Sequence, residues 1–400
     1  MKKILALLMA GCMALSLVAC GGTTSSTPGS TSGTTSGATE EAASTENTSN
    51  NKTDVAFVTD VGNIDDQSFN QYTWQGVQDF CAANNLKANY YRPSEDSDAA
   101  RIEQVDNAVN DGAKAVVMAG YLFASTLETV QTKYPDVSFL ALDVSTDDML
   151  GAGGVDTSAA DYDPAAIDMS QYITANTALV TYKEEQAGYL AGYAAVADGY
   201  TQLGFLGGIA VPAVIRYGYG FVQGADAAAN ELGIDGVNIN YWYSGTFEAN
   251  DEIVTKMDGW YTTGTEVIFA CGGQVGNSCA AAAQTNNGKM IGVDVDQSNL
   301  GDFVITSAMK SLANSVTVAL TDCMGNDWTW TDTYAGKQTV LGAAEDCVGL
   351  PMETSKFTNF TQDQYDSLFD AIKSGELVVD DSFDQNVHPE VTAVNVDYQG

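Results

Sequence analysis

The feature that most constrains this fold is a regular alternation of short apolar runs with amphipathic segments, starting at residue 54. The run DVAFVTD, residues 54–60, has the length and composition of a buried strand, and residues 68–84 place Val77 and Phe80 on one helical face. Strands that are apolar throughout and alternate with helices are typical of parallel sheets covered by helices on both faces. The sequence therefore predicts an α/β fold.

Two such series follow each other along the chain, which predicts two doubly wound, Rossmann-like lobes. A stretch rich in Gly, Asp and Ala without a clear period, residues 145–175, separates them and is predicted to be an irregular insertion. The runs predicted as strands span residues 54–60, 86–92, 113–120, 137–144, 178–183, 203–209, 238–245, 266–273, 290–296 and 303–310.

The N-terminus is predicted to be a targeting segment. A positively charged start is followed by an apolar stretch that is too short to span a membrane and that ends in LVAC at residues 17–20. This ending resembles a bacterial lipobox, and the alternative is an ordinary signal peptide with a chance cysteine. We expect residues 1–19 to be a lipoprotein signal peptide and Cys20 to carry a lipid anchor. Residues 20–51, rich in Ser, Thr and Gly, are expected to form a flexible tether.

Charge and cysteine spacing exclude two classes of site. The chain has 16 Lys and Arg against 52 Asp and Glu, a formal net charge of −36, so it lacks the basic clusters that bind a nucleic-acid polymer. No Cys-x-x-Cys spacing is present, so we expect no zinc or other structural metal. Cys12 belongs to the predicted signal peptide and Cys20 is the predicted lipid site. We expect most of the other five cysteines to be core residues, and the alternative is that two of them form a disulfide. These are Cys81, Cys271, Cys279, Cys323 and Cys347.

Ligands of doubly wound sheets bind beyond the carboxyl ends of the strands. In this chain those ends carry polar, small or aromatic residues, as a binding cleft requires. They are Asp60, Ala119, Gly120, Tyr121, Asp143, Gly207, Gly208, Gly272, Gly273, Asp294 and Lys310.

Three carboxylates, Asp60, Asp65 and Asp66, surround the turn after the first predicted strand. Their pattern is similar to the calcium-binding aspartate cluster of nucleoside hydrolases, but position 58 is Val and the spacing is one residue too long. A metal ion needs several oxygen ligands that converge from fixed spacing. We instead expect Asp65 and Asp66 to organise the turn and the start of the next helix, and Asp60 to face the cleft.

The same stretch, DVGNIDDQSFNQ at residues 60–71, resembles the signature of the basic membrane protein family, the purine-nucleoside-binding lipoproteins of ABC transporters. The resemblance covers about residues 54–380. Further motifs that carry it are EQAGYLAG at 185–192, GFVQG at 220–224, VIFACGGQVGN at 267–277, IGVDVDQ at 291–297 and TSAMK at 306–310.

This resemblance implies a type I periplasmic-binding-protein fold, in which a multi-stranded hinge joins the two lobes and a nucleoside lies between them. The crossovers of the hinge are expected near residues 179–183 and 304–308. Lobe 1 is expected to comprise residues 52–180 and about 305–340. Lobe 2 is expected to comprise residues 181–304 and about 341–400.

It also implies ligand contacts from the first lobe. Asp60 and Asn70 would lie in the cleft, Phe69 would stack on the base, and Asp143 would contact the ligand. This chemistry is reasonable in itself, because an aromatic ring suits the flat face of any purine.

Further contacts would come from the second lobe. Gly272 would allow close approach of the backbone, and Asp294 and Lys310 would hold the ribose hydroxyls, since one carboxylate can accept from two donors. A second aromatic residue for the base is expected at Tyr217 or Phe221, although Phe221 could equally be a core residue.

Arg216 and His388 bear on the function in other ways. Arg216 is expected to pair with a carboxylate, and the alternative is that it reads an anionic group of the ligand. His388 is the only histidine, and no GxSxG motif is present, which argues against serine or cysteine hydrolases that use a His base.

The sequence thus predicts a lipid-anchored, extracytoplasmic solute-binding protein of an ABC importer, monomeric and without cofactor or catalysis. It would capture guanosine, inosine or adenosine and deliver it to permease subunits. The alternatives are a binder of another flat ligand such as riboflavin, a calcium-dependent enzyme similar to nucleoside hydrolases, and a sensor without a transporter.

Overall fold

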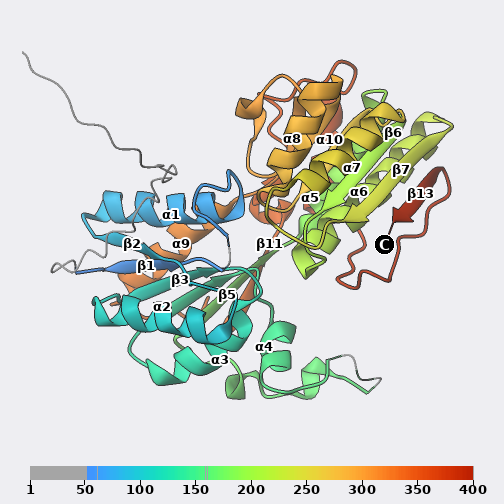
Figure 1. The fold of residues 1–400 in the computed structure, drawn as a ribbon. Coiled ribbons are helices and arrows are strands. Elements are labelled where there is room, and N and C mark those ends of the chain that lie inside the picture. The colour runs from blue at the N-terminus through green and yellow to red at the C-terminus, as the bar shows by residue number, and fades with distance from the viewer. Residues whose placement is uncertain (1–51, 61, 158, 160, 400) are drawn as a thin grey trace, which may run out of the picture. The chain divides into compact units, whose positions relative to one another are not determined.

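The computed structural model describes residues 52–60, 62–157, 159 and 161–399. The predicted signal peptide, Cys20 and the tether lie outside these residues. These residues form one compact unit, which contains two sheets flanked by helices (Figure 1). This arrangement confirms the predicted α/β fold with two doubly wound lobes. In the described part of the chain, no helix combines the length and the apolar character needed to cross a membrane.

The first sheet has the strand order β11-β5-β4-β3-β1-β2, and all its neighbours pair in parallel. We refer to this sheet and its covering helices as the first lobe. Its strands are β1 (Val55–Val58), β2 (Ala88–Tyr91), β3 (Ala115–Ala119), β4 (Ser138–Leu142), β5 (Thr177–Tyr182) and β11 (Lys337–Leu341).

Alternate residues of these strands pack against different helices. Val55 and Phe57 belong to the core beneath α1 and α9, whereas Ala56 and Val58 belong to the core beneath α2 and α3 (Figure 1). Both faces of the sheet are therefore buried, which explains why its strands are apolar throughout. The helices are α1 (Phe69–Asn84), α2 (Asp98–Asn110), α3 (Phe123–Lys133) and α9 (Leu312–Gly325).

The second sheet has the order β12-β10-β9-β8-β6-β7-β13, parallel except for β12 against β10. We refer to it and its helices as the second lobe. Its strands are β6 (Gln202–Gly207), β7 (Val237–Tyr243), β8 (Val267–Cys271), β9 (Lys289–Asp294), β10 (Val304–Lys310), β12 (Val348–Gly349) and β13 (Val394–Gln399). Its helices are α5 (Glu184–Ala197), α6 (Pro212–Leu232), α7 (Asp251–Thr262), α8 (Val275–Asn286) and α10 (Gln362–Ser374).

Helices α5 and α6 pack unusually closely on one face of this sheet. A Cβ atom on Gly220 of α6 would lie 2.0 Å from the carbonyl oxygen of Glu185, and one on Gly188 of α5 would lie 2.1 Å from that of Tyr217. Only glycine permits such an approach of two helix backbones. The contact fixes the N-terminal ends of both helices, which carry Glu184 and Tyr217.

The chain crosses between the sheets three times in its described part. It leaves β5 for α5, leaves β10 for α9, and leaves β11 for β12. The predicted division into lobes contains a crossing near each of these three places, although only the first two were expected as hinge crossovers. Strand β10 pairs with β9 in the second sheet, so the second crossover follows Lys310, whereas the predicted division placed residues from about 305 in lobe 1.

The stretch 145–175, predicted to be irregular, contains a short helix and two 3₁₀ turns. Helix α4 (Thr146–Ala152) begins with a capping box, in which Ser145 and Asp148 exchange hydrogen bonds between side chain and backbone. The turns are η1 (Pro164–Ala166) and η2 (Met169–Gln171).

Candidate functional site

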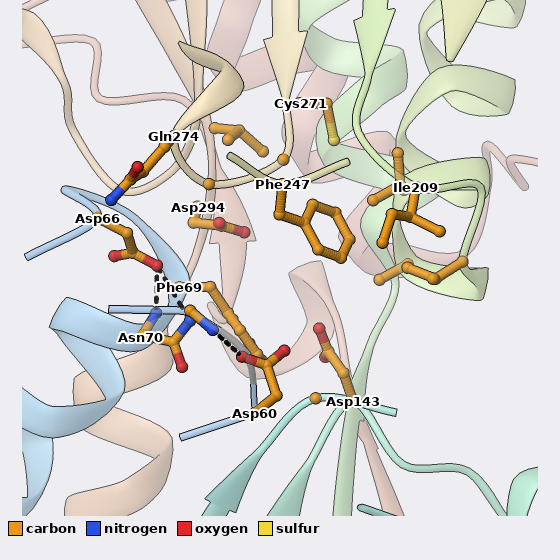
Figure 2. Close-up of a pocket in the computed structure, with 18 of the residues that line it drawn as sticks. Asp60, Asp66, Phe69, Asn70, Asp143, Ile209, Phe247, Cys271, Gln274 and Asp294 are labelled. Carbon is orange, nitrogen blue, oxygen red and sulfur yellow. Dashed lines mark hydrogen bonds between the residues drawn. The ribbon is translucent and has the colours of Figure 1, made fainter. Parts of the chain in front are cut away.

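A cavity of about 340 Å³ lies where the carboxyl ends of the strands of both lobes meet (Figure 2). This volume is within the range of small-molecule sites. The predicted site residues that line it are Asp60, Phe69, Asn70, Asp143, Tyr217, Gly272, Asp294 and Lys310. The cavity therefore lies at the strand ends where the sequence pattern predicts a binding cleft.

The first wall is the turn between β1 and α1, and Asp66 holds it in place. Its carboxylate accepts hydrogen bonds from the backbone N–H groups of Ser68, Asn70 and Gln71 at 2.9–3.0 Å. These are donors of the first helical turn that have no partner within the helix, so Asp66 acts as the predicted cap. Asp65 is exposed.

Asp60, Phe69 and Asn70 project from this turn into the cavity (Figure 2). Asp60 is 8% exposed and accepts a hydrogen bond from Gly62 N at 2.8 Å. Asn70 donates to Asp66 at 3.2 Å, whereas its own Oδ1 is buried without a hydrogen-bond partner in the described part of the chain. A buried acceptor without a partner costs stability, which suggests that Asn70 Oδ1 serves a ligand.

Asp143, directly after β4, and Asp294, the last residue of β9, share a backbone conformation that non-glycine residues seldom adopt. Their φ angles are +56° and +66°. This left-handed conformation aims each carboxylate from the strand end into the cavity, at an energetic cost that is common at binding sites. Asp143 Oδ1 is also buried without a partner among the described residues.

Lys310, the last residue of β10, provides the positive charge of the cavity. Its ammonium nitrogen lies 2.6 Å from Asp143 Oδ2, 3.3 Å from Glu184 Oε1 and 3.7 Å from Asp294 Oδ1. It also lies 4.6 Å from the centre of the Phe69 ring, within the range of a cation–π contact. Lys310 is 4% exposed, so these charges interact with little screening by water.

Arg216 provides a second positive charge next to the buried group formed by Lys310, Asp143, Glu184 and Asp294. Its Nε donates to Glu184 Oε2 at 2.7 Å, and Glu184 is fully buried. The expected pairing of Arg216 with a carboxylate is confirmed. Glu184 therefore lies between Arg216 and Lys310 and connects both cations.

Burial and these charges shift the pKa of each group. Burial raises the pKa of Asp143 to about 6; Lys310 opposes this rise, and Glu184 and Asp294 add to it. Burial alone would raise the pKa of Glu184, but Arg216 and Lys310 together hold it below its ordinary value. Burial lowers the pKa of Lys310, but Asp143, Glu184 and Asp294 outweigh this effect and raise it. The ammonium group therefore stays charged.

The second wall comes from loops of the second lobe. Gly272 has a φ angle of +142°, and a Cβ atom there would lie 3.0 Å from Gly208 Cα, so its backbone approaches the cavity without a side chain between. Phe247, in the loop after β7, points into the same space as Phe69 (Figure 2). The two rings enter the cavity from different lobes.

The structure separates the two residues expected to provide the second aromatic ring. Tyr217 lines the cavity, and its hydroxyl is buried without a hydrogen-bond partner in the described residues. Phe221 is fully buried, does not line the cavity, and packs against Phe269 with the ring centres 5.4 Å apart. Phe221 is therefore a core residue here. Phe247 was not among the predicted site residues, although an aromatic residue two positions beyond a predicted strand end is a usable signal.

No group of three or more His, Cys, Asp or Glu residues in the described ranges is placed to hold a metal ion. Asp66, one of the three carboxylates whose pattern is similar to a calcium site, already uses both oxygens to accept hydrogen bonds from the helix start. The five cysteines of the described part are buried and free. The arrangement offers hydrogen-bond acceptors, one cation and two aromatic rings, a combination suited to holding a polar molecule with a flat part.

Comparison with known proteins agrees with this description. The family model for Bmp, "ABC transporter substrate-binding protein PnrA-like", matches residues 53–382. A Lactococcus lactis protein named "ABC transporter nucleoside-binding protein BmpA" is 26% identical over 66% of this chain and 74% of its own length. Basic membrane protein A1 of Borrelia garinii is 26% identical over 80% of this chain and 86% of its own.

The solved structures show the same fold. A solute-binding protein of an ABC transporter system from Aeropyrum pernix superposes with a TM-score of 0.66 at 19% identity, covering 84% of this chain and 95% of the other. A second, from Conexibacter woesei, gives a TM-score of 0.62 at 20% identity, covering 82% and 99%. The predicted periplasmic-binding-protein fold is thereby confirmed.

Proposed function

This chain belongs to the Bmp family of PnrA-like substrate-binding proteins of ABC transporters, and we propose that it captures a purine nucleoside between its lobes. The observation that carries the proposal is the placement of Phe69 and Phe247, one from each lobe, around one cavity whose strand ends carry Asp143, Asp294 and Lys310. The relative from Lactococcus lactis is named a nucleoside-binding protein, which supports the choice of ligand class.

The base is held by the two aromatic rings. Stacking suits a purine because it offers two flat π faces, and closure of the lobes brings one ring to each face. Asp60 and Asn70 lie beside Phe69 and present polar atoms to the edge of the base. Base stacking gives affinity with little selectivity, so these edge contacts discriminate among guanosine, inosine and adenosine.

The ribose is held by Asp294, Lys310 and Asp143. Vicinal hydroxyls can both donate to one carboxylate, and the ammonium group of Lys310 donates to a ribose oxygen while it balances the carboxylates. Tyr217 contributes its hydroxyl, and Gly272 lets the backbone approach the sugar. Each of these groups is buried or largely buried and is held by its neighbours, so little ordering is required on binding.

The charge of the cavity selects a neutral ligand. Lys310 and Arg216 oppose Asp143, Glu184 and Asp294, so the buried group is net negative even before Asp60 is counted. A phosphate group placed there would be repelled and would lose its hydration. Nucleosides are therefore bound and nucleotides are rejected.

The cellular context follows from the N-terminal sequence and the family. We propose that the protein is a monomer anchored outside the cytoplasm by a lipid on Cys20, and that it passes its ligand to permease subunits. It holds the nucleoside without cleaving it, since the relatives are substrate-binding proteins.

Two experiments test this function. Mass spectrometry of small molecules that co-purify with the protein should detect a purine nucleoside, and calorimetry should show binding of guanosine, inosine or adenosine but not of guanosine monophosphate. Asp294→Ala should abolish this binding while the circular dichroism spectrum stays unchanged. Binding of riboflavin in preference to every purine nucleoside, or release of hypoxanthine from inosine, would contradict the proposal.

A further inference from the structure

Two hydrogen bonds connect the lobes beside the cavity. Of the four residues that form them, only Asp294 lines the cavity. Ser68 Oγ donates to Asp294 Oδ2 at 2.5 Å, and Gln297 Nε2 donates to the carbonyl oxygen of Gln67 at 3.0 Å. Ser68 and Gln67 belong to the turn before α1 in the first lobe. In the second lobe, Asp294 is the last residue of β9 and Gln297 lies in the loop that follows it. We call these four residues the lobe bridge.

The second-lobe half of the bridge is held rigidly. Gln297 is 4% exposed, its Oε1 accepts from Val293 N at 3.1 Å, and its own N–H donates to Ser307 Oγ at 3.0 Å. A Cβ atom on Gly292 would lie 2.5 Å from Gln297 Oε1, so glycine leaves the room that this amide occupies. With Oε1 fixed in its own lobe, Nε2 is directed at the first lobe.

The first-lobe half is equally preformed. Gln67 has a φ angle of +57°, which is uncommon for a residue other than glycine. Ser68 is fully buried, and its N–H donates to Asp66 at 2.9 Å. The turn therefore presents the Gln67 carbonyl group and the Ser68 hydroxyl group in fixed positions, at a cost in backbone strain that the surrounding structure must offset.

We propose that the lobe bridge controls how long a ligand stays bound, by stabilising the closed arrangement of the lobes directly. This role rests on the proposed capture between lobes, but it assigns Ser68, Gln67 and Gln297 a positioning function. Separation of the lobes breaks both hydrogen bonds and exposes the Asp294 carboxylate. The bridge therefore favours the closed population by its full free energy, and a ligand adds its own differential affinity to that bias.

The same geometry couples the bridge to the ligand through Asp294. Ser68 occupies one carboxylate oxygen, Oδ2, while Oδ1 is the atom nearest to Lys310 at 3.7 Å. A hydroxyl group of the ligand that donates to Asp294 thus binds a carboxylate already oriented from the opposite lobe. Loss of Ser68 should accelerate dissociation even though Ser68 itself does not line the cavity.

The experiment measures the distance between the lobes with and without guanosine. Fluorophores attached through unnatural amino acids at positions 136 and 235, both exposed and in loops of different lobes, report it by single-molecule energy transfer. Two variants test the bridge. Ser68→Ala removes one hydrogen bond, and Gln297→Glu keeps the acceptor for Val293 N but places a second acceptor opposite the Gln67 carbonyl group. The control is Ser278→Ala, since Ser278 is 3% exposed and its hydrogen bonds with Asn250 stay within the second lobe.

We expect both bridge variants to increase the open fraction in ligand-free protein and to raise the dissociation rate of guanosine about 10-fold. Ser68→Ala loses a hydrogen bond to the charged Asp294 carboxylate, and Gln297→Glu replaces a hydrogen bond by the repulsion of a carboxylate from the Gln67 carbonyl oxygen. Ser278→Ala should change neither quantity. An unchanged open fraction in both variants would overturn the proposal, even if dissociation were faster. The ligand-free measurement remains decisive if no nucleoside binds, so failure of the bridge and failure of the proposed ligand are distinguishable.

Discussion

The ammonium nitrogen of Lys310 lies 2.6 Å from Asp143 Oδ2, although Lys310 ends a strand of the second sheet and Asp143 follows a strand of the first. Both residues are largely buried, so the pair joins the lobes at the floor of the cavity. Because Glu184 also contacts Lys310 and is itself paired with Arg216, a single buried network connects the hinge, the cavity and both lobes.

Lys310→Gln should impair binding and stability together. We expect affinity for a purine nucleoside to fall more than 100-fold by calorimetry, because both the donor and the charge balance of the cavity are lost. The free energy of unfolding in urea should fall by about 3 kcal/mol, since Asp143 is left as an uncompensated buried carboxylate. Lys133→Gln, which removes an exposed ion pair with Asp106, should leave affinity unchanged. Wild-type affinity in Lys310→Gln would show that the network does not hold the ligand.

Asp143 should make binding depend on pH. Its pKa is raised from 3.8 to about 6, so it is ionised at pH 7 and becomes protonated as the pH falls through 6. A ligand that donates to the carboxylate prefers the ionised form. Affinity should therefore be constant above pH 7 and decline below about pH 6, by at most about tenfold per pH unit. Calorimetry between pH 5 and pH 8 measures this profile.

The same shift acts on stability with the opposite sign. Because the folded pKa lies above the unfolded value of 3.8, the folded protein binds this proton more readily between about pH 4 and pH 6. The contribution of Asp143 to the free energy of unfolding therefore decreases as the pH rises through that window. Asp143→Asn should remove both dependences, and an unchanged binding profile in this variant would assign the titration to another group.

Substitutions of the aromatic residues should affect either ligand affinity or stability, depending on whether the ring lines the cavity or the core. Phe69→Ala and Phe247→Ala are each expected to cost about 1–3 kcal/mol of binding free energy, the usual value of base stacking, with little change in the unfolding midpoint. Phe221→Leu should do the reverse, lowering stability by about 1 kcal/mol through imperfect core packing while affinity is retained. If Phe247→Ala binds as tightly as the wild-type protein, Phe247 does not contact the base.

Local sequence patterns were sufficient for the parts of the site that lie at strand ends. The end of a buried strand fixes Asp60, Asp143, Asp294 and Lys310 at one edge of each sheet, so their positions follow from the alternation alone. The cap formed by Asp66 is equally local, because it acts within five residues of its own position.

Contacts between distant segments explain what the sequence did not reveal. Tyr217 and Phe221 are four residues apart and share one face of α6, but only Tyr217 lies near enough to the end of the sheet to reach the cavity. Phe247 follows a strand in a loop without periodicity, and its position depends on packing beside Gly208 and Gly272. Strands β11 and β12 are short edge strands that lack the continuous apolar pattern.

The close packing of α5 on α6 predicts opposite effects for the same substitution at two helical glycines. Gly220→Ala would place a Cβ atom 2.0 Å from the carbonyl oxygen of Glu185, so the helices must separate, and we expect a loss of about 3 kcal/mol in the free energy of unfolding. Gly259→Ala, on exposed α7 surface with no atom within 4 Å of the added Cβ, should stabilise by about 0.5–1 kcal/mol because alanine favours the helix.

Thermal and urea unfolding of the two variants measure this difference. Because α5 begins with Glu184, a partner of Lys310, and the first two turns of α6 carry Tyr217 at the cavity, separation of the helices should also displace these residues. We therefore expect weaker nucleoside binding in Gly220→Ala under conditions where the variant is still folded, and unchanged binding in Gly259→Ala. Equal stability of the two variants would mean that the helices adjust to the added Cβ atom at no cost in free energy. In that case the close contact between α5 and α6 would not determine the positions of the site residues.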